Sequence, residues 1–244
     1  MPLIEICAYS LDSALAAEQA GADRIELCAD PAVGGTTPSA GNIEAAREHL
    51  RIPVMVMIRP RGGSFVYSEI EFESMKRDIA FCRKLKVEGV VLGVLDDQNN
   101  IDHARTAELI AAARPLNVTF HRAFDLTPDP IQALETVIAA GCTRVLTSGH
   151  RPTAVEGAAD IAKLITAADR RIIIMPGSGV RSTKLADLAR ITGAHEFHSS
   201  ARSVAATPTS APPNTIAQGF GEAPQIDLTE VQRLREAADA LDHA

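Results

Sequence analysis

The sequence predicts an α/β fold, a single-domain (β/α)₈ TIM barrel that spans residues 1–244. Short aliphatic or β-branched runs alternate with amphipathic helical stretches, a pattern typical of a parallel sheet. The length of 244 residues matches the roughly 250 residues of one such barrel. The predicted strands are Leu3–Cys7, Arg24–Cys28, Val54–Ile58, Gly89–Leu95, Val118–His121, Arg144–Leu146, Arg171–Met175 and Glu196–Ser199.

Residues typical of helix ends and loops support the first four strand–helix units. A helix is predicted over Leu11–Gln19 because Ser10 or Asp12 can cap its start and Gly21 can end it. The segments that follow strands two, three and four are polar or rich in turn formers, as loops at a barrel mouth should be. The next three helices are predicted over Gly41–His49, Glu69–Leu85 and Ile101–Ala113.

The later units are marked by turns and by one irregular stretch. Pro130 suits the first turn of the fifth helix, and Val180–Thr183 opens the seventh. Residues 203–224 lack periodicity and are rich in Ala, Pro, Ser, Thr and Gly, which predicts a long loop, either a lid or a disordered segment. The last helix is predicted over Leu228–Leu241, capped by Asp227 or Thr229.

Composition and net charge limit the classes of partner that the protein is expected to bind. A net charge of −7 disfavours a nucleic-acid backbone or an anionic membrane as the main partner. No apolar run reaches the ~18 residues of a membrane span, and the N-terminus has no secretory signal. Four cysteines without framework spacing predict reduced thiols and a cytoplasmic protein.

Strands one and two both contain Glu-x-Cys, as Glu5–Cys7 and Glu26–Cys28. Side chains alternate along a strand, so each glutamate should face the barrel axis together with its cysteine. A buried carboxylate is costly unless it is paired. Glu5 and Glu26 are therefore candidate acid–base residues, or alternatively members of an ion-pair layer in the barrel floor.

The thiols of Cys7 and Cys28 are candidate ligands of a soft ion such as Cu(I) or Zn²⁺. Met55 and Met57 could face inward on the next strand. The alternative is that the two cysteines are ordinary small core residues.

A cationic group follows strands three and five. Arg59 and Arg61 suit a carboxylate or phosphate substrate, and His121 could carry a proton or donate to a substrate oxygen. We expect Glu5, Glu26, Arg59 and His121 to converge within hydrogen-bonding reach, directly or through water. The alternative is that Arg59 only neutralises a glutamate and His121 is a core residue.

Small residues follow strands seven and eight, where many barrel enzymes bind phosphate. These turns predict an anion site, although tight turns without a ligand are the alternative. All five lysines fall in predicted helices, which disfavours a Schiff-base aldolase. The candidate anion-binding residues are Arg61, Gly177, Ser178, Gly179, Ser199 and Ser200.

On these motifs the chain resembles the CutC family, the copper homeostasis proteins, over about Leu3–Arg202. The resemblance implies a (β/α)₈ barrel, a cytoplasmic location, a homo-oligomer and copper binding, with Cys7 and Cys28 as the matching candidate ligands. Residues 203–224 match the family poorly. The motifs are Ala22–Cys28 (ADRIELC), Gly34–Ser39 (GGTTPS), Arg59–Gly63 (RPRGG) with Tyr67-Ser68, Val118–Asp125 (VTFHRAFD), Arg144–Gly149 (RVLTSG) and Phe197–Ala201 (FHSSA).

Two functions stay open: Cu(I) handling, or an enzyme that acts on a small anionic or phosphorylated substrate by Glu/His acid–base chemistry. Thiols on barrel strands, below a charged rim, are hard for a partner protein to reach, which favours the enzyme. Two thiolates can share one ion only if the sulfurs lie within ~4.6 Å. We expect the sulfurs of Cys7 and Cys28 to be poorly exposed and their copper binding to be weak.

Overall fold

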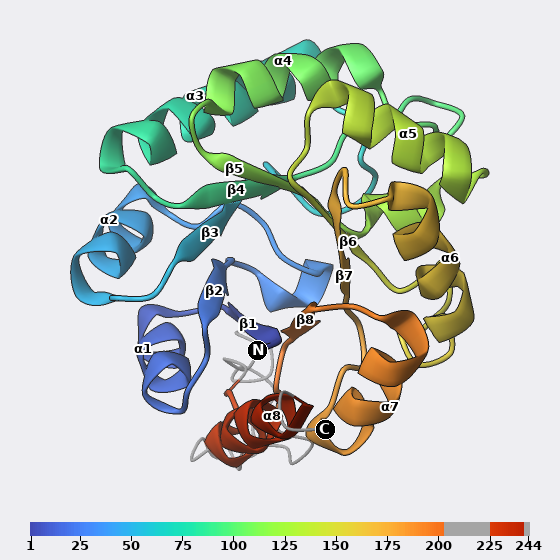
Figure 1. Cartoon of the computed structure of the whole chain (residues 1–244). Coiled ribbons are helices and arrows are strands. Elements are labelled where there is room, and N and C mark those ends of the chain that lie inside the picture. Colours follow the sequence, from blue (N-terminus) through green and yellow to red (C-terminus); the bar gives the residue numbers. More distant parts are fainter. Residues whose placement is uncertain (203–224, 242–244) are drawn as a thin grey trace, which may run out of the picture.

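The computed structural model describes residues 1–202 and 225–241. Its eight parallel strands form one sheet in the order β7-β6-β5-β4-β3-β2-β1-β8, which curls into a nearly closed barrel (Figure 1). The predicted fold class is therefore confirmed. The strands are β1 (Leu3–Ala8), β2 (Arg24–Leu27), β3 (Val54–Met57), β4 (Gly89–Leu92), β5 (Asn117–Phe120), β6 (Arg144–Thr147), β7 (Ile173–Pro176) and β8 (Glu196–Ser199).

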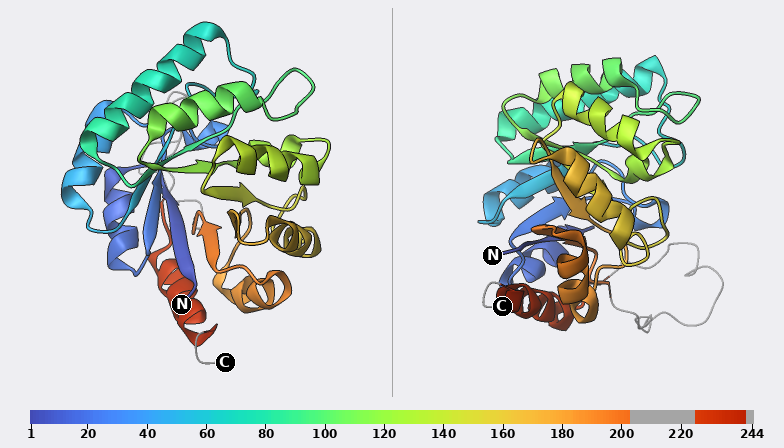
Figure 2. Two further views of the ribbon diagram at one scale, coloured as in Figure 1. Left: turned by 45° about the horizontal axis from the view of Figure 1, so that its top comes forward. Right: turned by 45° about the vertical axis from the view of Figure 1, so that its right-hand side comes forward.

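A ring of helices surrounds the strands, and the two further views in Figure 2 show it from the sides. Helix α8 packs against α7, α1 and β1 and so closes the ring of helices. The predicted irregular stretch 203–224 lies outside the described residues. The helices are α1 (Leu11–Gln19), α2 (Ala40–His49), α3 (Glu69–Leu85), α4 (His103–Ala113), α5 (Pro130–Ala140), α6 (Ala158–Ala168), α7 (Ser182–Thr192) and α8 (Leu228–Leu241).

Two short 3₁₀ turns were not predicted, and both lie at the mouth of the barrel. The first, η1 (Pro31–Val33), follows Asp30 in a left-handed conformation. The second, η2 (Arg122–Leu126), begins where the His121 side chain accepts a hydrogen bond from the backbone N–H of Ala123. A side-chain cap from histidine has no periodic signature, so the hydrophobic pattern could not reveal it.

Strand parity divides the core as the sequence predicts. Ile6 and Leu27 point away from the axis and pack with the helices. Inside the barrel, Cys7 and Cys28 form a separate small cluster with Met55, Met57 and Val91. The inward methionines of β3 are thus confirmed, and they fill the barrel beside the thiols.

The register of the neighbouring strands fixes what meets at the axis. Cys7 on β1 lies opposite Glu26 on β2, and Glu5 lies opposite His198 on β8. Because parallel strands end at one face, these side chains are stacked below a common mouth.

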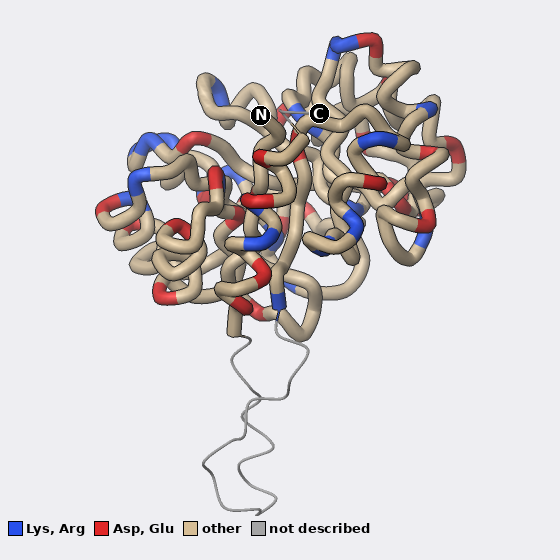
Figure 3. The backbone as a smooth tube through the Cα atoms, turned by 60° about the horizontal axis from the view of Figure 1, so that its bottom comes forward, with Lys and Arg blue, Asp and Glu red and all other residues tan. Residues whose placement is uncertain are grey.

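The outer surface carries both charge signs. Acidic and basic residues are interspersed along the described chain (Figure 3). Among the described residues, no helix combines the length and the apolar character that crossing a membrane requires.

Candidate functional site

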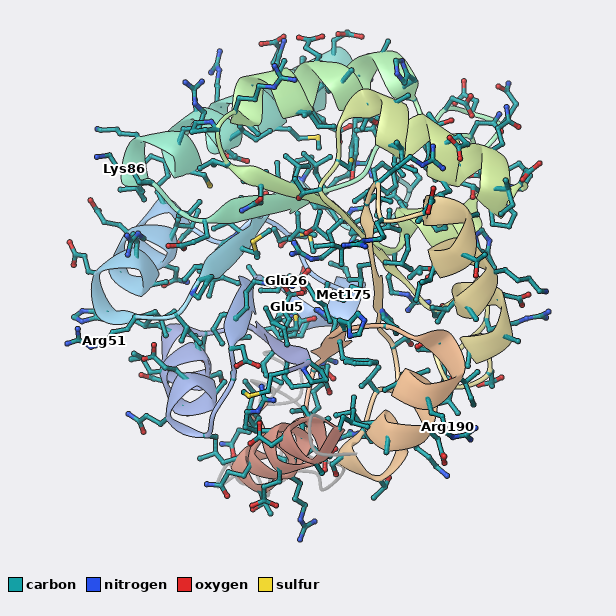
Figure 4. All side chains as sticks on the ribbon, viewed as in Figure 1. Glu5, Glu26, Arg51, Lys86, Met175 and Arg190 are labelled. Atoms are coloured by element: carbon teal, nitrogen blue, oxygen red, sulfur yellow. The ribbon has the colours of Figure 1, made fainter. Side chains whose placement is uncertain are left out.

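A buried ion-pair layer forms the floor of the barrel. Arg24 donates through Nε to Glu5 Oε2 at 2.5 Å and through Nη2 to Glu196 Oε2 at 2.6 Å. Arg144 donates to the same Glu196 carboxylate, at 2.6 Å through Nε and 3.1 Å through Nη2. Figure 4 shows Glu5 at the barrel centre, next to Met175, with Arg51, Lys86 and Arg190 pointing outward at the periphery. Of the two roles predicted for Glu5, the structure therefore agrees with membership of an ion-pair layer.

His198 connects this layer to the groups above it. Its Nδ1 lies 2.8 Å from Glu5 Oε1, and its Nε2 lies 3.8 Å from Glu26 Oε2. Burial opposes ionisation of Glu5, but the hydrogen bond from His198 and the charge of Arg24 outweigh it and lower the pKa of Glu5 to about 2. Burial likewise opposes protonation of His198, yet the charge of Glu26 and the contact with Cys7 raise the pKa of this imidazole well above its usual value. Glu5 and His198 therefore form a charged pair, which leaves His198 Nε2 for the groups above.

Glu26 lies in a different environment from Glu5. Burial raises the pKa of Glu26 well above its usual range, and the charge of His198 only partly offsets this. Its Oε2 accepts a hydrogen bond from the Cys28 thiol at 3.4 Å, whereas its Oε1 is buried without a hydrogen-bond partner. The two glutamates thus have the separated pKa values that an acid–base pair requires.

The two thiols lie next to each other, with 3.8 Å between Cys7 Sγ and Cys28 Sγ. Both residues are buried, at 5% and 2% exposure, so the prediction of poorly exposed sulfurs is confirmed. The polar contact with Cys28 lowers the pKa of the Cys7 thiol well below its usual value, although burial opposes this. The same contact, together with burial, raises the pKa of Cys28. Cys7 is therefore the thiol that carries negative charge more readily.

Ligand atoms for a metal ion are close together at this point. One donor atom each from Cys7, Glu26 and His198 lies within 4.8 Å of the others. With Cys28 beside Cys7, the set comprises two thiols, one imidazole and one carboxylate. Thiolate and imidazole are the donors that Cu(I) and Zn²⁺ prefer.

A cavity of about 630 Å³ opens above this cluster at the carboxyl ends of the strands, and Cys7, Glu26 and His198 contribute to its base. Its walls include Arg59, Arg122, Arg181 and Arg202. Arg122 pairs with Asp125. In the described ranges, the other three arginines form no ion pair with a carboxylate, so the cavity has an excess of positive charge.

These three arginines are held in different ways. Arg59 donates through Nη1 to the carbonyls of Val33 and Gly35 at 2.7 and 2.8 Å and through Nη2 to that of Gly63 at 3.0 Å. Arg202 lies over the ring of Tyr9 at 4.8 Å. The buried Nε atoms of Arg59 and Arg202 have no hydrogen-bond partner among the residues that the structure describes.

The Nη2 of Arg181 donates to the carbonyl of Arg202 at 2.9 Å. Each of the three guanidinium groups is thus fixed by contacts that leave its charge uncompensated.

His121 lines the same cavity but on the opposite wall from Cys7. Burial and the nearby charge of Arg59 lower its pKa to about 3, so the imidazole is neutral at physiological pH. Among the described residues, its hydrogen bond is the one that Nδ1 accepts from Ala123 N–H at 3.2 Å.

The predicted convergence of four residues is only partly realised. Glu5 and Glu26 meet at the axis, but their described partners are Arg24, His198 and Cys28 rather than Arg59 and His121. The physical reason is that the two pairs of residues lie at different heights along the barrel axis. Glu5 and Glu26 lie within β1 and β2, whereas Arg59 and His121 follow the ends of β3 and β5.

Only part of the predicted anion site lines the cavity. Arg61 does not line the cavity, because it pairs with Glu71 at 2.5 Å and donates to the carbonyls of the 62–66 turn. Ser199 Oγ donates to the Val180 carbonyl and Ser178 Oγ to that of Pro152, so both hydroxyls are committed to backbone. Gly177 lies against Leu146 and His198, where a Cβ would approach to 2.4 Å of Leu146. Of these turn residues, Ser178, Gly179 and Ser200 line the cavity.

Sequence reasoning missed Arg24, Arg144, His198 and Arg202. A signal for two of them was present, because Arg24 shares strand parity with Glu26, and His198 with Glu196. Extending the parity rule to every polar strand residue would have placed both inside the barrel. Arg202 follows the last strand, and no periodic pattern predicts where its side chain points.

A (β/α)₈ barrel with a charged cavity at the carboxyl ends of its strands belongs to the class in which ligand or catalytic sites occupy that face. The CutC family model matches residues 2–203. A CutC family protein of Chromobacterium violaceum is 47% identical over 242 residues, which cover 97% of this chain and 98% of the relative. One of Parabacteroides distasonis is 52% identical over 203 residues, which cover 83% and 84%. The chain belongs to the CutC family.

Solved structures agree with this assignment. The crystal structure of a candidate copper homeostasis protein CutC from Streptococcus agalactiae matches with a TM-score of 0.79 at 38% identity, covering 82% of this chain and 99% of that one. Phosphoribosylanthranilate isomerase from Thermotoga maritima matches with a TM-score of 0.61 at 13% identity, covering 98% and 99%. The second likeness shows the barrel fold alone.

Proposed function

We propose that the cavity binds a small anionic molecule and that Cys7 and Glu26 transfer protons to and from it. The observation that carries this proposal is the set of three cavity arginines that have no carboxylate partner among the described residues, placed above a buried cluster of titratable groups. Uncompensated guanidinium groups are typical of carboxylate and phosphate sites. Perturbed titratable groups in a cavity are typical of catalytic sites.

The residues divide into binding and chemical groups. Arg59, Arg181 and Arg202 bind the anion, aided by the backbone of the turn at Ser178 and Gly179. Cys7 is the base, because its thiol carries negative charge readily and faces the cavity. Glu26 is the acid, since burial raises its pKa well above the ordinary value and its Oε1 has no hydrogen-bond partner among the described residues. His198 positions both, and Glu5 holds His198.

Binding is tested by thermal melting against a panel of small phosphorylated and carboxylated compounds. We expect at least one compound class to raise the melting temperature of the wild type. Arg202→Ala should weaken that binding by roughly 10–100-fold, as expected for losing a charged hydrogen bond of about 1.5–3 kcal/mol.

Arg190→Ala is the matched control for this test. Arg190 lies on α7 away from the cavity, with its side chain 71% exposed. The proposal would be contradicted if both variants lost anion affinity to the same extent, or if no compound in the panel raised the melting temperature of the wild type.

A second candidate function is Cu(I) binding by Cys7 and Cys28. The specific observation in its favour is their separation of 3.8 Å, inside the ~4.6 Å that two bonds of about 2.3 Å allow. A bent arrangement at this distance leaves room for a third ligand, and His198 Nε2 points to the same place. The contact of His198 Nδ1 with Glu5 is the kind that orients metal-bound histidines. This geometry supports tighter Cu(I) binding than the weak binding expected from the sequence.

The copper candidate is tested by anaerobic Cu(I) titration against a competing chelator. The wild type and Cys7→Ser/Cys28→Ser are compared, with Cys82→Ser as a matched control in α3. A one-to-one complex lost only in the double variant supports this function. Binding that persists in the double variant rejects it.

A further inference from the structure

The wall of the cavity opposite Cys7 contains a histidine whose hydrogen atom can be placed from the structure. His121 Nδ1 accepts the backbone N–H of Ala123 at 3.2 Å. A backbone N–H can only donate, so Nδ1 must be the unprotonated nitrogen of a neutral ring. The hydrogen of that ring is then on Nε2. His121 is therefore a hydrogen-bond donor at Nε2 and has no lone pair on that nitrogen with which to remove a proton.

The ring is also fixed in place. Gly93 lies so close beneath it that a Cβ there would approach to 2.4 Å of His121 Cε1 and 2.5 Å of Nδ1. Phe65 packs on the ring with a centroid distance of 4.8 Å. His121 is only 4% exposed, yet within residues 1–202 and 225–241 its Nε2 has no hydrogen-bond partner. A buried donor without a partner costs free energy unless a ligand satisfies it.

A second donor belongs to a group that lies against the same phenylalanine. Arg59 Nε is buried without a partner in the described part of the chain, and the Arg59 guanidinium lies 4.8 Å from the centre of the Phe65 ring. Phe65 thus lies against both groups, and all three line the cavity. N–H donors that meet at the oxygen of a ligand stabilise a developing oxyanion.

We propose that His121 Nε2–H and Arg59 Nε–H together bind the carbonyl oxygen of the cavity's ligand. This inference rests on the proposed function and specifies its substrate class as a small anionic carbonyl compound. The C–H bond next to the carbonyl breaks, its proton passes to Cys7, and its electron pair forms the C=C bond of an enolate. The negative charge that develops on the carbonyl oxygen is held by the two N–H donors. Returning a proton from Glu26 to carbon completes an isomerisation or an exchange, with no oxidant required.

Oxalate is a suitable probe, because it is a planar dianion that resembles such an enolate. We use protein with ¹⁵N-labelled histidine and observe His121 by NMR between pH 5 and 8. The free protein should show a neutral ring with hydrogen on Nε2 throughout this range, and oxalate should move the Nε2–H proton signal downfield. A cationic ring, or one with hydrogen on Nδ1, would overturn the assignment whether or not oxalate binds.

Affinity for oxalate gives the second readout. His121→Ala should weaken binding by about tenfold, as expected for one hydrogen bond to a charged ligand. His121→Gln retains an N–H donor and should recover most of the loss. Melting curves of the unliganded variants show whether they fold. If oxalate binds the wild type and folded His121→Ala equally well, the donor role fails while the anion cavity stands. If oxalate does not bind the wild type, the proposed function fails for this ligand class and the inference fails with it.

Discussion

Arg24→Met is the substitution that should destabilise the barrel most clearly. The Arg24 guanidinium is 5% exposed and bridges Glu5 and Glu196 at 2.5 and 2.6 Å. Methionine retains much of the volume but no charge. Glu196 would keep Arg144, whereas Glu5 would keep only His198. Breaking a buried ion pair typically costs 3–5 kcal/mol, so we expect a loss of roughly 3 kcal/mol, at the lower end of that range.

The assay is urea unfolding at pH 7 with a matched surface control. Arg171→Met removes an exposed ion pair with Glu135, whose side chains are 42% and 52% exposed, and such pairs contribute only about 0–1 kcal/mol. Adding Glu5→Gln to Arg24→Met should restore part of the loss, because the buried negative charge is gone. The reasoning is refuted if Arg24→Met costs no more than Arg171→Met, or if Glu5→Gln makes the loss larger.

Three further predictions address the site. Gly93→Ala should displace the His121 ring and lower oxalate affinity, and unchanged affinity in a folded variant would contradict the contact seen here. Arg61→Ala should leave anion affinity within about twofold while reducing stability, because Arg61 pairs with Glu71 outside the cavity; calorimetric titration and melting measure the two effects. Glu5 has a folded pKa of about 2 against an ordinary 4.5, so its stabilisation is present above pH 4.5 and is lost as the pH falls toward 2. Urea unfolding between pH 6 and 3 should therefore show a smaller loss of stability in Glu5→Gln than in the wild type.

Much of the fold could be predicted because strand and helix periodicity is a local property. The bounds of α1, α3, α8 and β8 match the prediction, and the ends of the other strands differ from it by at most three residues. The inward direction of Glu5 and Cys7 followed from alternation along β1 alone. Self-association and a cytoplasmic location stay predictions.

The site was harder to predict, because it depends on the relative height of side chains on different strands. The alternation of side chains predicted that Glu26 and His121 face the inside of the barrel, but it could not show that Glu26 lies at the base of the cavity and His121 nearer its mouth. It could not show the 3.8 Å contact of Cys7 and Cys28 either, since stagger between neighbouring strands is not encoded in a local pattern. Nor could it separate Arg59, which faces the cavity, from Arg61, which pairs with Glu71.

Solvent-deuterium exchange tests the central claim most directly. Small anionic carbonyl compounds are incubated with the protein in D₂O, and loss of the C–H signal next to the carbonyl is followed by ¹H NMR. We predict exchange with at least one compound in the wild type, and a loss of at least about 100-fold in Cys7→Ser and Glu26→Gln, as expected when a general base or acid is removed. Cys142→Ser, which changes a buried thiol outside the cavity, should exchange like the wild type. Exchange that is absent from the wild type, or that survives unchanged in Cys7→Ser and Glu26→Gln, would contradict the account.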